Sequence, residues 1–248
     1  MDELVYASNT TTSYTHLFNF EKNFVPQDAQ MWMEGHFPYC FLYCALYAIL
    51  ISGGKLYMSN RPKYDLRRGL VMWSASLALF SITAVYRTMP SIFHLVRHRG
   101  LHYNICVPNI NEDLILGYWS YLFALSKLVE FGDTFFIVLR KQPLIFLHWY
   151  HHIVTFLYSW LSYVEDAAYA RLFAFINGFI HSFMYIYYTF KAMGYHPPRW
   201  LAMTITLMQL SQMFVGSFLT TTAYYYVYIA KVECHVTPLN ITVAGIIF

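Results

Sequence analysis

The sequence predicts an all-α membrane protein, a polytopic helical bundle that crosses the bilayer several times. Only 12% of its 248 residues are charged, whereas a soluble domain carries about 25%. Hydrophobic residues make up 58% of the chain, and the mean hydropathy is +0.39. Apolar runs also recur along the chain at about the 20-residue length that a spanning helix needs. This composition argues against a soluble domain, and no basic patch for nucleic acid is present.

The apolar runs place the membrane spans. We expect spans at about residues 37–54, 70–96, 114–139, 144–164, 170–190 and 200–230. A seventh run begins near Pro238 and stops at Phe248, too short to cross the bilayer by itself. The prediction is therefore seven spans, the seventh incomplete in this chain. Residues 1–36 form an N-terminal segment, and residues 37–248 form a single transmembrane domain.

The distribution of charge predicts the orientation. Loops that follow the first, third and fifth spans hold most of the Lys and Arg, with Asp65 as their only acid. The other loops hold acids such as Glu112 and Glu165. Because short cytosolic loops carry an excess of Lys and Arg, the first set is expected to be cytosolic. The N-terminus is then lumenal, in agreement with a glycosylation sequon at Asn9.

This orientation places Cys106 and Cys234 in two different lumenal loops. Disulfides form and persist in an oxidising lumen. We therefore predict a disulfide between these two residues. The alternative is that one or both are free because the loops do not meet.

Three histidines lie within the run from residue 144 to 164, which contains no charged residue. The spacing of His148, His151 and His152 places all three on one face of a helix. Imidazoles are costly to bury in a bilayer, and an ionisable group inside a span is by default a functional-site hypothesis. The cluster is therefore the main candidate for the site.

Polar residues in three other spans lie at a similar depth. At about 1.5 Å per residue, all of them fall roughly 6–18 Å inside the cytosolic face. They are Lys127, Glu130 and Asp133 in the third span, His181 in the fifth, and Gln209 and Gln212 in the sixth, and the fifth span also contains Asn177. This common depth predicts a shared site. The structural alternatives are a buried ion network for the charged residues, hydrogen bonds between helices for the amides, and an interfacial belt for Tyr185 and Tyr188.

Two chemistries suit the histidines. HxxHH is one of the boxes of di-iron membrane desaturases and hydroxylases, and His94, His98 and His102 offer a second box. The predicted topology places that second box at the lumenal side, so the two boxes would not share a metal. Alternatively, an imidazole attacks an acyl thioester, a neighbouring base moves protons, and amides stabilise the oxyanion. A proton-coupled transporter is a further alternative.

The polar residues form four motifs: KxxExxDT at Lys127–Thr134, HxxHH at His148–His152, NxxxHxxMYxYY at Asn177–Tyr188 and TxxQxxQ at Thr206–Gln212. These motifs resemble those of one known family, the ELO-type membrane elongases of very-long-chain fatty acids. All four occur in the family's order between about residues 127 and 213. The HWYHH form of the box resembles the subgroup that acts on saturated and monounsaturated acyl-CoAs.

The resemblance implies a multi-pass enzyme of the endoplasmic reticulum, with spans two to seven forming a six-helix barrel around an acyl tunnel. It implies condensation of acyl-CoA with malonyl-CoA to 3-ketoacyl-CoA, CO2 and CoA, without a metal or other cofactor. His151 would accept the acyl group, His148 and His152 would orient it or move protons, and His181 would face it across the tunnel. Asn177, Gln209 and Gln212 would polarise the substrates, with Tyr185 and Tyr188 lining the site and Lys127, Glu130 and Asp133 supporting it.

The same resemblance predicts the partners. A polyanionic CoA would dock at the basic cytosolic face, where Arg140, Lys141 and Arg199 are candidates for its phosphates. The structural alternative is that these residues only follow the positive-inside rule. Membrane lipid, a homodimer, and the 3-ketoacyl-CoA reductase, dehydratase and enoyl reductase of the elongation cycle are the other expected partners.

Overall fold

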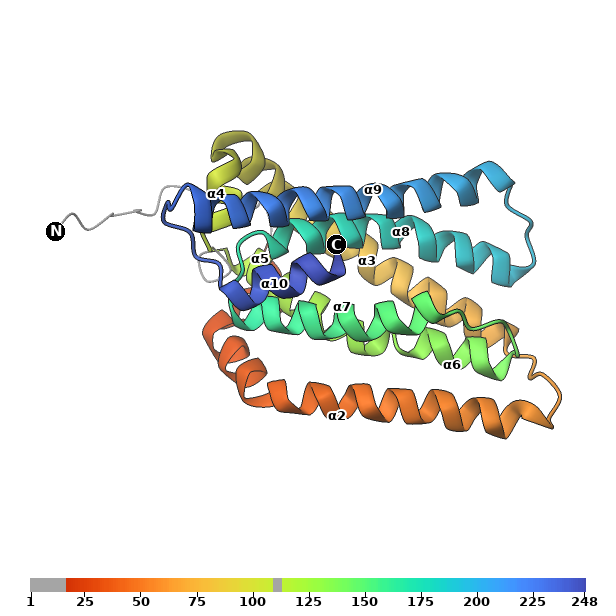
Figure 1. Ribbon diagram of the computed structural model, residues 1–248. Coiled ribbons are helices and arrows are strands. Elements are labelled where there is room, and N and C mark those ends of the chain that lie inside the picture. The colour runs from red at the N-terminus through yellow and green to blue at the C-terminus, as the bar shows by residue number, and fades with distance from the viewer. Residues whose placement is uncertain (1–16, 109–112) are drawn as a thin grey trace.

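The chain folds into a bundle of long helices that run roughly side by side (Figure 1). The computed structural model describes residues 17–108 and 113–248, and helices form all of the regular structure in these residues. In chain order they are α1 (Asn19–Lys22), α2 (Pro26–Ser59), α3 (Arg67–His98), α4 (Gly100–Cys106), α5 (Leu114–Val129), α6 (Gly132–Leu139), α7 (Phe146–Val164), α8 (Ala170–Met193), α9 (Arg199–Tyr224), the π-turn η1 (Tyr225–Ile229) and α10 (Pro238–Ile247).

Most helices follow the predicted spans to within a few residues, but two differ. α2 begins at Pro26 and therefore runs across the predicted boundary between residues 36 and 37. Proline suits the first turn of a helix, where its missing N–H has no helical partner. The predicted span over 114–139 consists of two helices, because the chain breaks at Glu130 and Phe131 into α5 and α6. That break lies in the motif that begins at Lys127.

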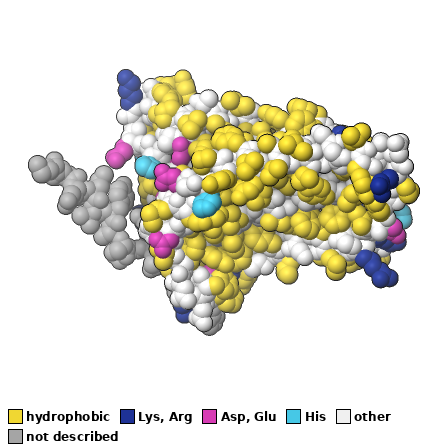
Figure 2. Space-filling view, turned by 90° about the horizontal axis from the view of Figure 1, so that it is seen from below, with side chains coloured by type: hydrophobic (Ala, Val, Ile, Leu, Met, Phe, Trp, Pro, Cys, Tyr) yellow, Lys and Arg dark blue, Asp and Glu magenta, His cyan; other side chains and the backbone are white. Residues whose placement is uncertain are grey.

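Three described helices are long and apolar enough to cross a membrane: Pro26–Ser59, Arg67–His98 and Arg199–Ile229. Many apolar side chains along these helices are exposed. Leu56, for example, is 77% exposed, and Phe214 is 78% exposed. Figure 2 shows hydrophobic side chains across the middle of one face, with charged side chains gathered toward its two ends. An apolar surface of this extent fits a lipid environment. The molecule is therefore an all-helical membrane protein.

The packing of the helices joins segments that are far apart in sequence. α3 packs along α8, α2 packs against α6 and α7, and α9 contacts both α8 and α10 (Figure 1). One apolar core includes Tyr47, Phe131 and Phe156, from α2, the break and α7. A second core gathers around Cys106 and includes Tyr169 and Ala223. The motif-bearing helices are thus fixed by two separate cores.

Local chemistry defines the ends of the helices that carry the motifs. The carboxylate of Asp113 caps α5, because Oδ1 accepts hydrogen bonds from the N–H of Ile115 at 3.0 Å and Leu116 at 3.1 Å. Gly194 ends α8 with φ +95°, a left-handed conformation that favours glycine. Pro198 then precedes α9. These caps determine where α5, α8 and α9 start or stop along the bundle.

A disulfide joins two loops at the same end of the bundle. Cys106 and Cys234, which the sequence analysis paired, are bonded with an S–S distance of 1.99 Å. The N–H of His235 also donates to the carbonyl of Cys106 at 2.9 Å. The disulfide therefore ties the end of α4 to the segment that precedes α10.

We expect Cys106→Ser to unfold at a lower temperature than the wild type. The disulfide closes a loop across a sequence separation of 128 residues. In the chain-entropy model, such a loop stabilises the fold by roughly 4–5 kcal/mol. Thermal unfolding in detergent, with and without reductant, measures the effect. Reductant should lower the midpoint of the wild type but not that of Cys106→Ser, and equal sensitivity of the two would contradict the prediction.

A buried carboxylate holds α1 against the bundle. Glu21 is fully buried and accepts hydrogen bonds from Nε of Arg87 at 2.9 Å and Nε1 of Trp119 at 2.9 Å. Nη2 of Arg87 lies 2.5 Å from the other carboxylate oxygen. Burial by itself would raise the pKa of Glu21, but the hydrogen bonds from Arg87 and Trp119 outweigh it and lower the pKa. The ionised form is therefore the stabilising one.

Stability should fall in acid as Glu21 becomes protonated. The folded pKa lies below the ordinary value of 4.5, so the contribution is complete above that pH and is lost as the pH falls through the folded pKa. Glu21→Gln should be less stable by about 1–3 kcal/mol at neutral pH. It should also lack this part of the acid dependence. Unfolding midpoints measured across the acid range test this, and parallel curves for the two proteins would contradict it.

Candidate active site

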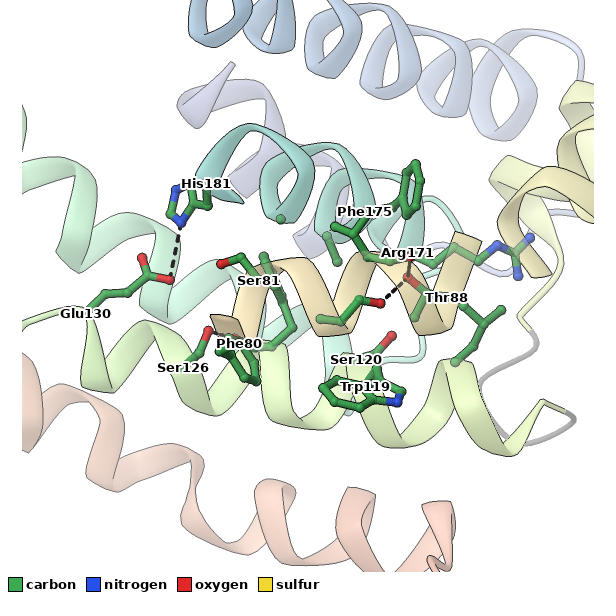
Figure 3. A pocket seen from close by; sticks show the side chains of 16 residues that line it. Phe80, Ser81, Thr88, Trp119, Ser120, Ser126, Glu130, Arg171, Phe175 and His181 are labelled. Carbon is green, nitrogen blue, oxygen red and sulfur yellow. Dashed lines mark hydrogen bonds and ion pairs between the residues drawn. The ribbon is translucent and has the colours of Figure 1, made fainter. Parts of the chain in front are cut away.

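The site is organised around the break between α5 and α6. Nζ of Lys127 donates to Glu130 at 2.8 and 3.2 Å, and to Oδ1 of Asn177 on α8 at 2.7 Å. Nδ1 of His181, one turn after Asn177, lies 3.5 Å from Oε1 of Glu130 (Figure 3). Lys127 and Glu130 are only 3% and 4% exposed. Two opposite charges at this depth compensate each other and connect α5 to α8.

The amide of Asn177 extends this network to α9. Its Nδ2 donates to Oε1 of Gln212 at 3.4 Å. Three of the predicted helices thus meet through Lys127, Asn177 and Gln212. The similar depth inferred from the sequence is matched here by direct contacts between the side chains.

Asp133 lies just after the break and has two partners. Nε1 of Trp73 on α3 donates to Oδ1 at 2.6 Å, and the hydroxyl of Tyr185 on α8 donates to Oδ2 at 2.8 Å. Gly132 makes the first contact possible, because a Cβ at this position would collide with the Trp73 indole. The ring of Tyr188 lies 6.4 Å from that of Tyr185 and is partly exposed. Asp133 therefore joins α6 to both α3 and α8.

The histidine cluster of α7 faces the same break. Nε2 of His148 lies 3.1 Å from Oγ1 of Thr134, within hydrogen-bonding distance. The ring of His152 lies 4.5 Å from that of His148 and 5.8 Å from that of His151. Phe131, the residue after Glu130, meets the His152 ring edge-on, with ring centroids 6.4 Å apart. The cluster on α7 and the ion network between α5 and α8 thus form one polar region inside the bundle.

A narrow cavity leads away from this region between α3, α5 and α8. Glu130 and His181 line one end, whereas Trp119 and Arg171 line the other (Figure 3). Its volume is about 30 Å3, and the aromatic side chains of Phe80, Phe123 and Phe175 line it. An apolar chain longer than a few atoms would require these rings to move. A larger apolar cavity of about 580 Å3 lies on the other side of the break, beside Tyr43, Tyr47 and Trp73.

Other predicted site residues lie apart from the polar region. Gln209 is exposed, and its Nε2 donates to the sulfur of Met184 at 3.3 Å. Arg140 and Lys141 follow α6, and Arg199 is exposed at the start of α9. Nζ of Lys141 donates to the carbonyl oxygens of Ser59 at 3.2 Å and Arg61 at 2.8 Å. A role for these residues in binding phosphate stays a prediction, and Asn9 lies outside the described residues.

The second histidine box is separate from the first. The rings of His94 and His98 lie 4.8 Å apart on α3, and Nε2 of His102 lies 3.1 Å from the carbonyl oxygen of Glu233. In residues 17–108 and 113–248, no three His, Cys, Asp or Glu side chains are grouped as ligands of a metal ion. The two boxes therefore do not combine into one ligand set.

Comparison with known proteins identifies the family. The model of the family described as ELO: GNS1/SUR4 matches residues 32–248. The chain belongs to the ELO family. It is similar to very long chain fatty acid elongase 6 of Drosophila melanogaster, 44% identical over 238 residues, which cover 95% of this chain and 75% of the relative. Elongase 6 of Gallus gallus is 45% identical over 199 residues, 80% of this chain and 75% of the relative. Very long chain fatty acid elongase 3 of Homo sapiens is 35% identical over 237 residues, 94% of this chain and 86% of the relative.

Three residues at the site of this ELO-family chain were not singled out from the sequence. Thr134 belongs to a motif but had no assigned role, and Tyr47 and Trp73 lie in spans with many other aromatic residues. The Tyr47 hydroxyl lies within hydrogen-bonding distance of Thr134, and the Trp73 indole N–H donates to Asp133. In a chain with 20% aromatic residues, residue type alone does not distinguish such contacts from ordinary packing. Only the positions of the helices reveal them.

Proposed function

We propose that this ELO-family protein is a fatty acid elongase that condenses a long-chain acyl-CoA with malonyl-CoA. The products are a 3-ketoacyl-CoA, CO2 and CoA. The observation that carries the proposal is that the histidine cluster and the buried Lys127, Glu130 and His181 network both lie at the break between α5 and α6, which brings a nucleophile near charged and proton-transferring groups. Its family membership and elongase relatives support the same reaction.

The reaction divides into two transfers. A ring nitrogen of His151 attacks the thioester carbonyl, the C–S bond breaks, and CoA leaves as a thiolate that takes up a proton. Decarboxylation of malonyl-CoA then releases CO2 and leaves the electron pair on the α-carbon. This carbanion, or its enolate form, attacks the acyl-imidazole, the C–N bond breaks, and the departing His151 ring takes up a proton, which restores the neutral imidazole.

The surrounding residues act on charge and position. In the proposal His148 and His152 orient His151 or move protons, and His181 faces it across the tunnel. Asn177, Gln209 and Gln212 polarise the thioester or malonyl carbonyl, as amides stabilise developing oxyanions. Lys127, Glu130 and Asp133 form the supporting network, with Tyr185 and Tyr188 beside the acyl group. No metal or other cofactor takes part in these steps.

The same proposal includes the membrane arrangement. Seven spans follow a lumenal segment of residues 1–36, and spans two to seven form a barrel around the acyl tunnel in the endoplasmic reticulum. The basic loops after α2, α6 and α8 support a cytosolic site entrance. The disulfide between Cys106 and Cys234 supports a lumenal position for the opposite loops. Asn9 would then be glycosylated.

The substrates and partners follow from this arrangement. The subgroup resemblance favours saturated and monounsaturated acyl-CoAs, and Arg140, Lys141 and Arg199 would bind CoA phosphates at the entrance. A homodimer in the membrane would work with the 3-ketoacyl-CoA reductase, dehydratase and enoyl reductase, because these activities reduce and dehydrate its product. Surrounding lipid would contact the exposed apolar faces.

The test uses the purified full chain in detergent with palmitoyl-CoA and carboxyl-labelled malonyl-CoA, without NADPH. We expect labelled CO2 and 3-ketoacyl-CoA in equal amounts, unaffected by chelators. Iron content measured on the same sample checks the desaturase alternative. If folded protein gives no product with a series of saturated, monounsaturated and branched acyl-CoAs, the proposed function is wrong.

A further inference from the structure

A chain of buried hydroxyl groups reaches the histidine cluster from α2. The hydroxyl of Tyr47 lies 2.6 Å from Oγ1 of Thr134, and that oxygen lies 3.1 Å from Nε2 of His148. Tyr47 is 2% exposed and Thr134 is fully buried. A buried hydroxyl group that lacks a hydrogen-bond partner destabilises the fold. The arrangement therefore restricts which of these atoms donate and which accept.

Only one direction of the chain satisfies every hydrogen. Within the described residues, Thr134 is the hydrogen-bond partner of the Tyr47 hydroxyl. If Tyr47 donates to Thr134, the Thr134 hydroxyl donates to Nε2 of His148, and the imidazole proton is on Nδ1. In the opposite direction Thr134 donates to Tyr47, and no side chain or carbonyl of residues 17–108 and 113–248 accepts the Tyr47 hydrogen. Tyr47 thus selects the Nδ1–H tautomer of His148.

The ring of Tyr47 supports a second histidine by a separate route. It stacks on Phe131 with ring centroids 4.1 Å apart and an interplanar angle of 22°. Phe131 in turn meets the His152 ring edge-on, at 6.4 Å and 83°. The hydroxyl route and the ring route start from the same side chain. Tyr47→Phe removes the first route and keeps the second.

We propose that Tyr47 is a positioning residue for acyl transfer, which acts through Thr134 to fix the tautomer and ring orientation of His148. The role rests on the proposed condensation, because it requires His148 to work beside His151. With Nε2 occupied as an acceptor, His148 orients the cluster instead of taking up the reaction proton through that nitrogen. Tyr47 lies on α2, whereas the four motifs begin only at Lys127.

The experiment compares Tyr47→Phe, Thr134→Val and the double variant in the condensation assay. We expect Tyr47→Phe to lower kcat roughly tenfold, the scale of one buried hydrogen bond, with KM for acyl-CoA within about twofold because the tunnel is unchanged. Thr134→Val should lower kcat at least as much. Because the two residues act in one chain, the double variant should be no slower than Thr134→Val by more than about twofold.

Tyr43→Phe is the matched control. Tyr43 lies one turn before Tyr47 on α2 and lines the same 580 Å3 cavity. Among the described residues its hydroxyl makes no hydrogen bond, so its loss should leave kcat unchanged. Thermal unfolding of each variant accompanies the kinetics, and Tyr47→Phe should unfold within a few degrees of the wild type.

Four results would overturn this role. They are an unchanged kcat in Tyr47→Phe, losses that multiply in the double variant, an effect on KM alone, and an equal loss in Tyr43→Phe. Each of them arises in a protein whose wild type condenses substrates, so the proposed function would stand. A wild type that is silent with every acyl-CoA would instead overturn the proposed function and this role with it.

Discussion

Replacing His151 by alanine is expected to lower the rate of condensation by roughly 10⁴-fold or more, the scale seen when an enzyme loses its nucleophile. In the proposed mechanism this imidazole forms the acyl intermediate, so its removal leaves the acyl group without an acceptor. His151 is half-buried and forms no core contact comparable to those of Phe156, so the fold should survive. The loss should appear in kcat for CO2 release from labelled malonyl-CoA.

A trapping experiment separates the nucleophile from its neighbours. Wild-type protein incubated with labelled acyl-CoA alone should retain one acyl group per chain after rapid denaturation, and His151→Ala should retain none. His98→Ala is the control, because His98 is an exposed imidazole near the far end of α3. If His151→Ala condenses substrates at near the wild-type rate, His151 is not the nucleophile, and His148 and His152 become the candidates.

Glu130→Gln should cause the largest loss of stability among single changes at the site, about 3–5 kcal/mol. The substitution leaves the Lys127 ammonium buried, 3% exposed, with only neutral amide oxygens, that of the introduced side chain and that of Asn177, to accept its hydrogen bonds. An uncompensated charge at this depth costs far more than the loss of one neutral hydrogen bond. Denaturant or thermal unfolding in detergent measures the change.

A double variant that removes both charges separates the loss of stability from the loss of catalysis. Lys127→Met combined with Glu130→Leu removes both charges, so most of the stability should return while condensation stays low. Glu34→Gln is the matched control, because Glu34 is exposed on α2 and should unfold like the wild type. Equal midpoints for Glu130→Gln and the wild type would show that Lys127 is not held by this charge pair.

The sequence predicts the membrane class and most helix limits, because apolar runs and charged loops depend only on local composition. It also predicts that Lys127, Asn177 and Gln212 share a site, because polar residues at similar depth on neighbouring helices tend to contact one another. The break at Glu130 was not predicted, because residues 114–139 contain no proline and no charged residue apart from Lys127, Glu130 and Asp133. The hydrogen bond between Trp73 and Asp133 lies just after it.

The depth of a residue in the membrane does not predict which way its side chain points around the helix axis. Gln209 and Gln212 are three residues apart on α9, yet Gln212 reaches Asn177 while Gln209 is exposed. Tyr47 differs from the other tyrosines of α2 only because of how α2 packs against α6 and α7, which the sequence does not show. Such assignments depend on how each helix is rotated, which is decided by packing across the whole bundle.

The disulfide between Cys106 and Cys234 turns residues 106–234 into a closed covalent ring. All four motifs lie inside that ring, as do α5 to α9. A single cut in any loop within the ring would open it without releasing a fragment. α2 lies outside the ring, so packing and the loop to α3 hold Tyr47 against Thr134. A cut in the loop between α2 and α3 would therefore leave α2 bound to the ring by packing alone, and α2 carries the residue that sets the state of His148.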